Sequence, residues 1–407
     1  MGILSRIAQP RASMTTNTMT TGTLEQIFRS LITSTASGIA ITPDTALRAS
    51  AVFACNKVIS ETVAQLPIRL YQKLPQNGKA EAVKHPLYKL IGKQPNHLQT
   101  SFGFREMMTG HTVIRGNSYA LKNRVGMGRV AGLVPLSPDC VTVSIDSMMQ
   151  RTYNVTTNGQ TKSFPQEDIF HLMGMTLNGW QGVSVLTYAR ESIGLSLATE
   201  KFGAKLFSNG AKMSGILTTP SKFKLADTAR KIGEDFDAAT SGGNAHKTIV
   251  LDDGMTWNKV SMTSEDSQFL ETRGFQIPEI ARFFRMPLHK IQDMSASTNN
   301  NIEQQALEFL TDCMLPWLER WTQSLDTQLL TEQEQDEYYF QFDVDDLLRA
   351  DTVSRFTAYG LGIANRILNP NECRTKENLN PYDGGDKFEN PAITPGQSKE
   401  PAPQPKK

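Results

Sequence analysis

Apolar residues recur every three to four positions in two long stretches of the chain, and this spacing is typical of one face of an α-helix. The first stretch covers residues 43–66 and ends at Pro67, which cannot continue a helix. The second covers residues 184–208 and ends at Asn209-Gly210, a pair that suits a helix C-terminus. We therefore predict a helix in each stretch.

Between residues 117 and 172 the apolar period shortens to two, as in half-buried strands. Asn158-Gly159 lies between two alternating segments and can supply the positive φ angles of a two-residue hairpin turn. Gly126-Met127-Gly128 lies between two further segments of the same kind. These patterns predict an antiparallel β-rich block.

The rest of the chain is mostly helical but contains a small insertion. Helical patterns return at residues 264–286 and 302–330, and Pro316 is expected to kink the second of these. The elements predicted for the insertion are a strand at 214–217, a helix at 225–239, and strands at 248–251 and 256–260. Taken together, the patterns predict an α+β fold.

Three polar stretches are expected to lie outside the packed core. Residues 1–42 contain a Ser/Thr-rich tract with few apolar side chains, and residues 381–407 carry six of the 20 prolines. We predict that the first is flexible and the second disordered. The third, residues 292–301, reads QDMSASTNNN between two predicted helices, and its simplest interpretation is a solvent-exposed connection.

The composition excludes several classes of protein. With 407 residues, 39% hydrophobic and 20% charged, the chain suits two or three globular domains rather than a membrane-embedded or disordered protein. Its 42 Lys and Arg against 41 Asp and Glu leave a formal charge of +1, so no large field draws it to nucleic acid or lipid. The four cysteines lack CxxC spacing, which favours a reducing compartment.

No apolar stretch has the length of a membrane span or the form of a secretory signal, so we expect no membrane association. Arg6 stands where an N-myristoylation pattern requires Ser or Thr, which argues against a lipid anchor.

Two short motifs match the sequence patterns of known functional sites, but their sequence context does not fit those sites. Residues 126–131 match the GxGxxA pattern of a dinucleotide-binding loop, but Pro135 and Pro138 prevent the helix that such a loop must enter. Gly182-Val183-Ser184 resembles half of a nucleophile elbow, and Ser184 is better placed as a helix N-cap.

Metal-ligating patterns are equally weak. The six histidines, none of which pairs with another or with a cysteine at metal-ligand spacing, are His85, His97, His111, His171, His246 and His289. The carboxylate clusters that could hold a hard cation are Asp252-Asp253 and the group Asp343, Asp345 and Asp346. Their positions at strand ends or helix starts also suit the helix dipole. We therefore predict no catalytic residue, no metal site and no cofactor.

A series of short motifs resembles the siphophage-type portal proteins of tailed bacteriophages. The motifs, in chain order, are Ala51–Cys55, Glu61–Pro67, His85–Tyr88, Gln94–Asn96, Arg115–Ala120, Leu136–Asp139, Asp168–His171, Gly182–Ser184, Phe207–Ala211, Arg285–Pro287 and Asn369–Glu372. Their order and spacing extend the resemblance over residues 43–388.

This resemblance implies the portal-protein fold, with a β-rich wing, a two-helix stem, a small α/β clip, a long kinked helix and a helical crown. The implied parts are a flexible N-terminal segment 1–42, wing 43–183, stem helix 184–210, clip 211–263, second stem helix 264–290, tunnel loop 291–301, long helix and returning wing strand 302–344, crown 345–380 and disordered tail 381–407.

The resemblance also implies a function without enzymatic activity. Twelve subunits would form a ring at one capsid vertex, through which DNA enters during packaging and leaves during ejection. The implied partners are copies of itself, the terminase large subunit, a head-completion adaptor, the major capsid and scaffolding proteins, and double-stranded DNA bound without sequence specificity. Such a head–tail connector is assembled in the host cytoplasm and stays in the virion.

The implied tunnel loop makes physical sense as a channel lining. DNA presents a phosphate about every 1.7 Å, so a lysine-lined channel would hold the duplex through many counterion-releasing contacts. Rotatable polar side chains offer only weak hydrogen bonds, and Asp293 and Glu303 repel phosphate. The residues predicted to line the channel are Asp293, Met294, Ser295, Ser297, Thr298, Asn299, Asn300 and Asn301.

Ring formation in a nearly neutral chain depends on shape and apolar contact. Gly194 and Gly203 lie inside the predicted helix 184–208, where each costs about 1 kcal/mol relative to alanine. Such a cost is tolerable where another backbone packs close. We therefore predict that neighbouring subunits pack through the face carrying these two glycines.

Two other functions stay open at this level. A metal-dependent enzyme acting on nucleic acid could use Asp343, Asp345 and Asp346 to hold magnesium. A head-shell or adaptor subunit is the second alternative, and the order of long helix, insertion, helix and polar loop disfavours it.

Overall fold

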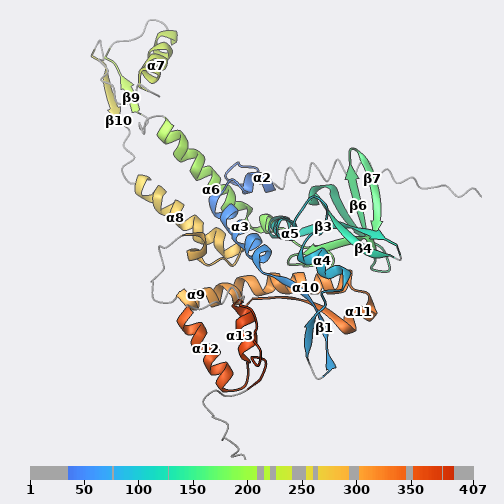
Figure 1. Ribbon diagram of the computed structural model, residues 1–407. Helices are drawn as coiled ribbons and strands as arrows, with labels where there is room; N and C mark the ends of the chain where they lie inside the picture. Colours follow the sequence, from blue (N-terminus) through green and yellow to red (C-terminus); the bar gives the residue numbers. More distant parts are fainter. Residues whose placement is uncertain are drawn as a thin grey trace, which may run out of the picture. The chain divides into compact units, whose positions relative to one another are not determined.

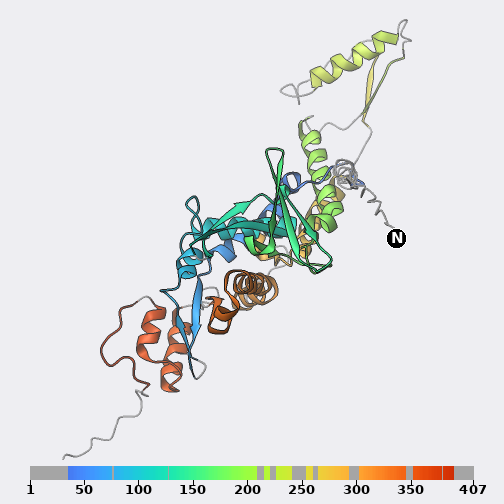
Figure 2. The same ribbon diagram turned by 90° about the vertical axis from the view of Figure 1, so that its right-hand side faces the viewer.

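A computed structural model describes most of the chain. The described residues are 35–75, 78–126, 128–208, 215–220, 226–240, 254–259, 265–292, 302–344, 352–377 and 379–388. The chain divides into two compact units (Figures 1 and 2), Met1–Thr298 with Phe309–Phe342 and Asn299–Glu308 with Asp343–Lys407. The predicted tunnel loop lies outside the described residues from Asp293 to Asn301.

The described residues of the first unit form helices and four antiparallel sheets. Its helices are α2 (Pro43–Ala46), α3 (Ser50–Gln65), α4 (Pro86–Gly92), α5 (Ser101–Arg115), α6 (Val185–Ser208), α7 (Ala226–Thr240), α8 (Glu265–Phe283), α10 (Leu315–Leu329) and α11 (Glu332–Glu337). Short 3₁₀ turns occupy Pro138–Cys140, Gln166–Asp168 and Leu288–Ile291. The α+β prediction is confirmed, but the predicted helix 43–66 is two helices, because Ala49 takes an extended conformation between them.

The predicted β-rich block is present, although two of its strands are buried on successive residues, 117–120 and 169–172, rather than on alternate ones. The strands are β1 (Ile68–Lys73), β2 (Lys79–Glu81), β3 (Asn117–Val125), β4 (Arg129–Leu136), β5 (Val141–Ile145), β6 (Arg151–Thr157), β7 (Gln160–Pro165), β8 (Ile169–Met173), β9 (Gly215–Thr218), β10 (Thr256–Lys259) and β11 (Tyr338–Phe342). The sheet orders are β4-β3-β8, β5-β6-β7, β11-β1-β2 and β10-β9. Asn158 and Gly159 have φ angles of 52° and 76° between β6 and β7, which confirms the predicted hairpin turn.

The sheet β11-β1-β2 joins distant parts of the chain. β1 pairs antiparallel with β11, with Ile68 opposite Phe342 and Tyr71 opposite Tyr339. A strand returning to this unit after the long helix was predicted, and this pairing confirms it. The predicted strand at 248–251 lies outside the described residues.

The core between α3 and α5 contains a buried arginine. Arg105 of α5 is 6% exposed and donates hydrogen bonds to the backbone carbonyls of Val63, Ala64 and Leu66 at 2.6–3.1 Å. Burial lowers the pKa of Arg105 to about 10, so the guanidinium stays charged at neutral pH. A cation here satisfies the carbonyls that the C-terminus of α3 leaves without intrahelical partners.

The long helix is interrupted before Pro316, as its position predicts. The chain forms a π-helix over Phe309–Met314 before α10 begins, because Pro316 has no N–H to continue the α-helical ladder. α10 is then fixed to the core by Trp321, which is fully buried and donates to Thr109 Oγ1 at 2.9 Å.

Residues 35–42 differ from the predicted flexible segment. Thr35 is 7% exposed and Ile41 5% exposed, and Thr42 caps α2 in a capping box with Thr45. The segment has too few apolar side chains for its packing to be predicted from the sequence pattern. Its order depends instead on contact with α6, about 150 residues away in sequence. Residues 1–34 lie outside the described part.

The second unit contains α9 (Ile302–Glu308), α12 (Thr352–Ala364) and α13 (Pro370–Lys376). Residues 381–388, expected to belong to a disordered tail, form turns around Asn371 instead. Its amide donates to Tyr382 O at 3.0 Å and Asp386 Oδ1 at 2.9 Å, while its carbonyl oxygen accepts from Tyr382 N at 3.0 Å. The buried side chain of Asn371 therefore orders this polar segment without an apolar core.

Candidate functional site

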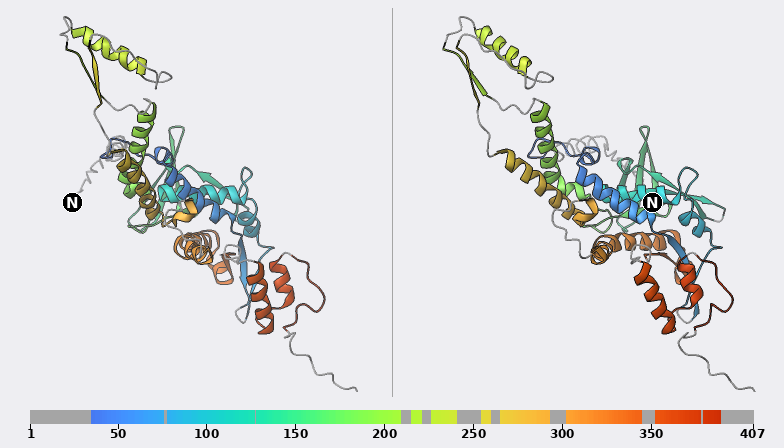
Figure 3. Two further views of the ribbon diagram at one scale, coloured as in Figure 1. Left: turned by 90° about the vertical axis from the view of Figure 1, so that its left-hand side faces the viewer. Right: turned by 60° about the vertical axis from the view of Figure 1, so that its left-hand side comes forward.

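Two helices, α6 and α8, lie side by side (Figure 3), and their assignment as a stem pair stays a prediction. Ala189 and Ile193 on α6 and Ile280 on α8 are all fully buried. The predicted helix 184–208 is confirmed almost residue for residue. The predicted helix 264–286 ends earlier, at Phe283, and it carries Pro278, which removes one backbone hydrogen bond from its interior.

Polar contacts fix the pairing of α6 and α8. Ser192 Oγ donates to Glu279 Oε1 at 3.2 Å, and Gln276 Nε2 donates to Thr199 Oγ1 at 3.2 Å. Gln276 is only 2% exposed, so its hydrogen bond is made where water does not compete. Together these pairs specify how far the two helices are shifted along each other.

The segment that leads into α6 contacts the backbone next to the sheet β4-β3-β8 without intervening side chains. A Cβ placed on Gly182 would lie 2.0 Å from the carbonyl oxygen of Gly116, and one on Gly174 would lie 3.2 Å from the same atom. Gly116 itself has φ +78° after α5, a conformation that favours glycine. The crossing brings together the residue between α5 and β3 and the two ends of the segment between β8 and α6. It is possible because glycine occupies all three positions.

Asn117 locks the same crossing with two hydrogen bonds. Its Oδ1 accepts from Gly182 N at 2.7 Å, and its Nδ2 donates to Gly182 O at 2.8 Å. Ser184 then caps α6, as predicted, by accepting from Leu186 N at 3.2 Å, and its hydroxyl donates to Ile114 O at 2.7 Å. The direction of α6 is thus set by the first residue of β3 and the last turn of α5.

A buried histidine on β8 connects this crossing to β6 of the neighbouring sheet. His171 Nε2 lies 3.0 Å from Asn117 Oδ1, and its Nδ1 lies 3.1 Å from the Tyr153 hydroxyl. Because Oδ1 can only accept, Nε2 carries the proton and Nδ1 accepts from Tyr153. Burial, assisted by the charge of Arg151, lowers the pKa of His171 to about 3, so the imidazole is neutral. His171 therefore has a structural role in the described part of the chain.

The long helix α10 is attached to the same residue. Gln328 Oε1 accepts from His171 N at 2.8 Å, and Gln328 Nε2 donates to His171 O at 2.9 Å. This side chain pairs with the free edge of β8 as a neighbouring strand would. Asn117, His171 and Gln328 therefore tie α6, the wing sheets and α10 into one network, which the sequence patterns did not reveal.

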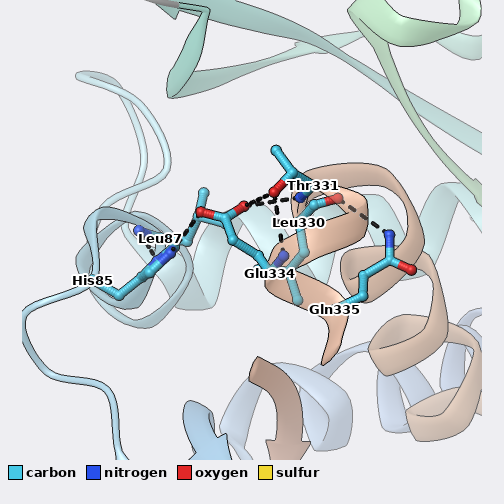
Figure 4. A network of polar contacts seen from close by, with 6 residues as sticks. All are labelled: His85, Leu87, Leu330, Thr331, Glu334 and Gln335. Atoms are coloured by element: carbon cyan, nitrogen blue, oxygen red, sulfur yellow. Dashed lines mark hydrogen bonds and ion pairs between the residues drawn. The ribbon is translucent and has the colours of Figure 1, made fainter. Parts of the chain in front are cut away.

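A second network joins α4 to α11 (Figure 4). His85 Nδ1 accepts from Leu87 N at 3.2 Å at the start of α4, and its Nε2 lies 3.2 Å from Glu334 Oε1. Glu334 also completes a capping box with Thr331. Burial raises the pKa of Glu334, but the hydrogen bonds from Thr331 and His85 outweigh it and leave the pKa below its usual value. His85 thus has a structural role.

The structure places one of the two predicted packing glycines against its own chain. A Cβ on Gly194 would lie 2.7 Å from the Thr35 side chain, so this glycine accommodates residues 35–36. Gly203 is buried, and its role between subunits stays a prediction.

The described residues contain no group of three or more His, Cys, Asp or Glu side chains that could hold a metal ion. Of the acidic cluster considered for magnesium, Asp343 is described and Asp345 and Asp346 are not; Asp252 and Asp253 also lie outside the described residues. Within the part of the chain that the structure covers, no helix has both the length and the apolar character of a membrane span.

Substituting Gly182 with alanine should destabilise the protein, because the new methyl group meets a backbone oxygen that has no side-chain freedom to move. We expect a loss of at least about 2 kcal/mol in the free energy of unfolding, measured by urea denaturation. Gly233→Ala is the matched control, since a Cβ there meets nothing within 4 Å in α7, and this change should be neutral or slightly stabilising. Equal effects of the two substitutions would contradict the crossing described above.

Acid should weaken the protein through His171. Its folded pKa of about 3 is below the ordinary value of 6.5, so only the unfolded chain takes up this proton as the pH falls below 6.5, and stability is lost progressively toward pH 3. Between pH 7 and pH 5 we expect a loss of about 2 kcal/mol from this group. His171→Gln keeps a donor and an acceptor without titrating. Its free energy of unfolding should fall less over the same interval, and an identical pH dependence would count against a buried neutral His171.

Comparison with known proteins agrees with this architecture. Residues 50–378 match the family model described as phage portal protein. The chain is 33% identical over 386 residues to a probable portal protein of Streptomyces phage phiC31, covering 90% of this chain and 83% of that protein.

Two solved structures share the fold. An HK97-family phage portal protein from Corynebacterium diphtheriae is 19% identical, with a TM-score of 0.56 over 78% of this chain and 97% of that chain. The neck of a native gene transfer agent particle, computed with C12 symmetry, contains a chain that is 21% identical, with a TM-score of 0.58 over 83% of this chain and 92% of that chain. The fold is therefore the portal-protein fold, and the chain belongs to the phage portal protein family.

Proposed function

We propose that twelve copies of this chain form the portal ring at one capsid vertex and conduct double-stranded DNA during packaging and ejection. The observation that carries the proposal is the family match from residue 50 to residue 378, which includes α6, α8, the insertion between them and the segment that follows. The C12 neck of the gene transfer agent supplies the symmetry. The ring acts as a conduit and has no enzymatic activity of its own.

Residues 293–301 are the proposed channel lining. The segment contains one acidic side chain, Asp293, and no basic one, so it offers no cation to a phosphate. The described residues before it include one cation that is directed elsewhere, since Lys290 Nζ lies 4.7 Å from the centre of the Phe309 ring. A duplex can therefore slide past weak, exchangeable hydrogen bonds.

The stem pair supplies apolar surface for contact between copies. Tyr188 of α6 is 60% exposed and Phe275 of α8 is 61% exposed. Side chains of this size are costly to leave in water along a whole helix pair. Together with Gly203, they form the proposed subunit contact of the stem.

The insertion between α6 and α8 is the proposed clip, where the terminase large subunit and later the head-completion adaptor dock. Its described part pairs β9 with β10, with Thr218 opposite Thr256, and includes the charged helix α7. Arg230 on α7 contacts Asp227 and Glu234 at 3.5 and 4.0 Å on an exposed surface. Such a polar surface suits partners that exchange during assembly.

The major capsid and scaffolding proteins are the further proposed partners. The ring assembles in the host cytoplasm and remains in the virion as the head–tail connector.

Deletion of residues 294–300 tests the channel assignment. We expect rings of normal size by negative-stain microscopy and light scattering, because the stem and wing contacts are unchanged. Packaged DNA, measured as nuclease-protected genome per particle, should fall at least tenfold.

A matched control replaces residues 294–300 with an equally long Gly/Ser segment, which restores length without the native side chains and should recover part of the packaging. Normal packaging by the deletion variant would exclude this segment as the channel lining. A protein that stays monomeric with capsid and scaffolding proteins present would exclude the ring itself.

A further inference from the structure

The three-stranded sheets of the first unit have six edge strands: β2, β4, β5, β7, β8 and β11. An edge strand presents backbone N–H and C=O groups that can pair with another chain. Proteins usually block such edges with a covering segment, with charges, with proline or by keeping the strand short. Five of these six edges are blocked in one of these ways, and β5 is the exception.

Three edges are blocked by other parts of the chain. Leu133 N of β4 donates to Pro95 O at 2.8 Å, and Phe340 N of β11 donates to Asp326 Oδ1 at 2.8 Å. Gln328 pairs with the edge of β8, as described above. In each case the backbone groups that would attract another strand already have a partner.

Two further edges are blocked by their composition. β2 has three residues, and two of them, Lys79 and Glu81, are charged. β7 contains Lys162 and ends at Pro165, which has no N–H to offer. Neither strand is a good template for pairing.

The strand β5 has none of these features. Its sequence VTVSI contains neither a charge nor a proline. The hairpin that follows shows which of its backbone groups face outward. Asp146 N donates to Gln150 O at 3.1 Å, so Ile145 and Arg151, which lie opposite each other, form a pair without mutual backbone hydrogen bonds. The N–H and C=O groups of Ile145 therefore point away from β6.

The same holds for Val143 and Val141, because the register with β6 is unbroken and the two kinds of pair alternate. Val141 N donates to Pro138 O in the preceding 3₁₀ turn. In the part of the chain that the structure describes, the outward N–H and C=O groups of Val143 and Ile145 have no hydrogen-bond partner. The edge of β5 thus carries two unused donors and two unused acceptors in regular order.

The side chains of β5 define what an added strand must present. Val143 is buried in the cluster that contains Tyr119 and Tyr153, and Val141 packs against the same cluster. On the opposite face, the side chains at 142 and 144 are exposed threonine and serine. An added strand therefore needs apolar side chains on the cluster side and polar ones on the other, in strict alternation.

We propose that β5 accepts an extended segment of a different protein as a fourth strand of the sheet β5-β6-β7. The segment places apolar side chains beside Val141 and Val143 and polar ones beside Thr142 and Ser144. Extended polypeptide is the occupant because its N–H and C=O groups repeat at the spacing of the free groups on β5.

A second copy of this chain is a poorer occupant. Of the six edges considered, it could offer only its own β5, and two β5 strands would pair about a twofold axis. The proposed ring repeats one contact in one direction and cannot contain such a pair. This exclusion of a second copy rests on the proposed function.

A fluorescent peptide of alternating valine and threonine, with a lysine at each end, tests the proposal on the full chain. The matched control peptide is N-methylated at every valine and threonine, which removes its backbone donors and keeps its side chains. By fluorescence anisotropy we expect the control to bind at least tenfold more weakly. Bound peptide should also slow hydrogen exchange in residues 141–145. Equal binding of the two peptides would overturn the proposal.

A substitution on the protein gives a second test. Ser144→Lys adds a charge at the edge of β5, and Ser163→Lys on β7 is the matched control, because both serines hydrogen-bond to Asn154. We expect Ser144→Lys to weaken peptide binding at least fivefold and Ser163→Lys to leave it unchanged, with equal stability of the two variants in urea. Equal peptide binding by the two variants would refute strand addition at β5.

Two other outcomes would assign the edge to this chain itself and so overturn the proposal. In the first, residues 141–145 exchange slowly without peptide and faster after removal of residues 2–34 or 389–407. In the second, light scattering shows dimers that Ser144→Lys abolishes. Ring formation is measured by light scattering on the unsubstituted protein without peptide, so a failure of the proposed function is distinguishable from a failure of this inference.

Discussion

The contact between bare backbones at Gly116, Gly174 and Gly182 is the constraint on which the arrangement of this subunit depends. It brings the end of α5, the end of β8 and the start of α6 so close that no side chain fits between them. Asn117 then closes the crossing with hydrogen bonds in both directions to Gly182. Side chains can change rotamer, but backbone atoms in direct contact cannot. The direction of α6 relative to the sheet β4-β3-β8 is therefore nearly fixed.

The groups that surround this crossing are polar: Tyr153, His171 and Asn117 are buried and uncharged, Gln328 is half-buried, and the charge of Arg151 lies close enough to lower the pKa of His171. Tyr153, His171, Asn117 and Gln328 satisfy one another, and burial keeps His171 neutral with a pKa of about 3. A network of neutral donors and acceptors fixes geometry through direction rather than through long-range charge, so it avoids the desolvation cost of buried ions. Arg105, one of the buried cations of the described residues, is stabilised by hydrogen bonds to carbonyl groups at the end of α3.

Local patterns were enough to predict the elements whose causes are local. The Asn158-Gly159 hairpin, the bounds of α6 and the interruption before Pro316 each follow from residues within a few positions. The order of these elements, with the motifs between them, was also enough to predict the family. Arg105, Asn117, Gln328 and Asn371 could not be predicted in their roles, because each acts on backbone that is distant in sequence or irregular.

The same reason explains the two segments whose order was underestimated. Residues 35–36 pack because Gly194 on α6 leaves room for Thr35, and residues 381–388 form turns because Asn371 satisfies their backbone groups. In both cases contact with a single distant residue orders the segment. Such a contact leaves no periodic apolar pattern that the sequence could show.

The two helices that flank residues 293–301 differ from the root of α6 in backbone regularity. α8 contains Pro278, and the helix that follows the loop is interrupted by the π-helix before Pro316. Each proline removes a backbone hydrogen bond, which lowers the cost of bending the helix at that point. The root of α6, by contrast, has no such interruption and is fixed by close backbone contact. This difference fits the proposal that residues 293–301 line the channel, since flanking helices that bend at low cost would let such a lining adjust to passing DNA while the direction of α6 stays fixed.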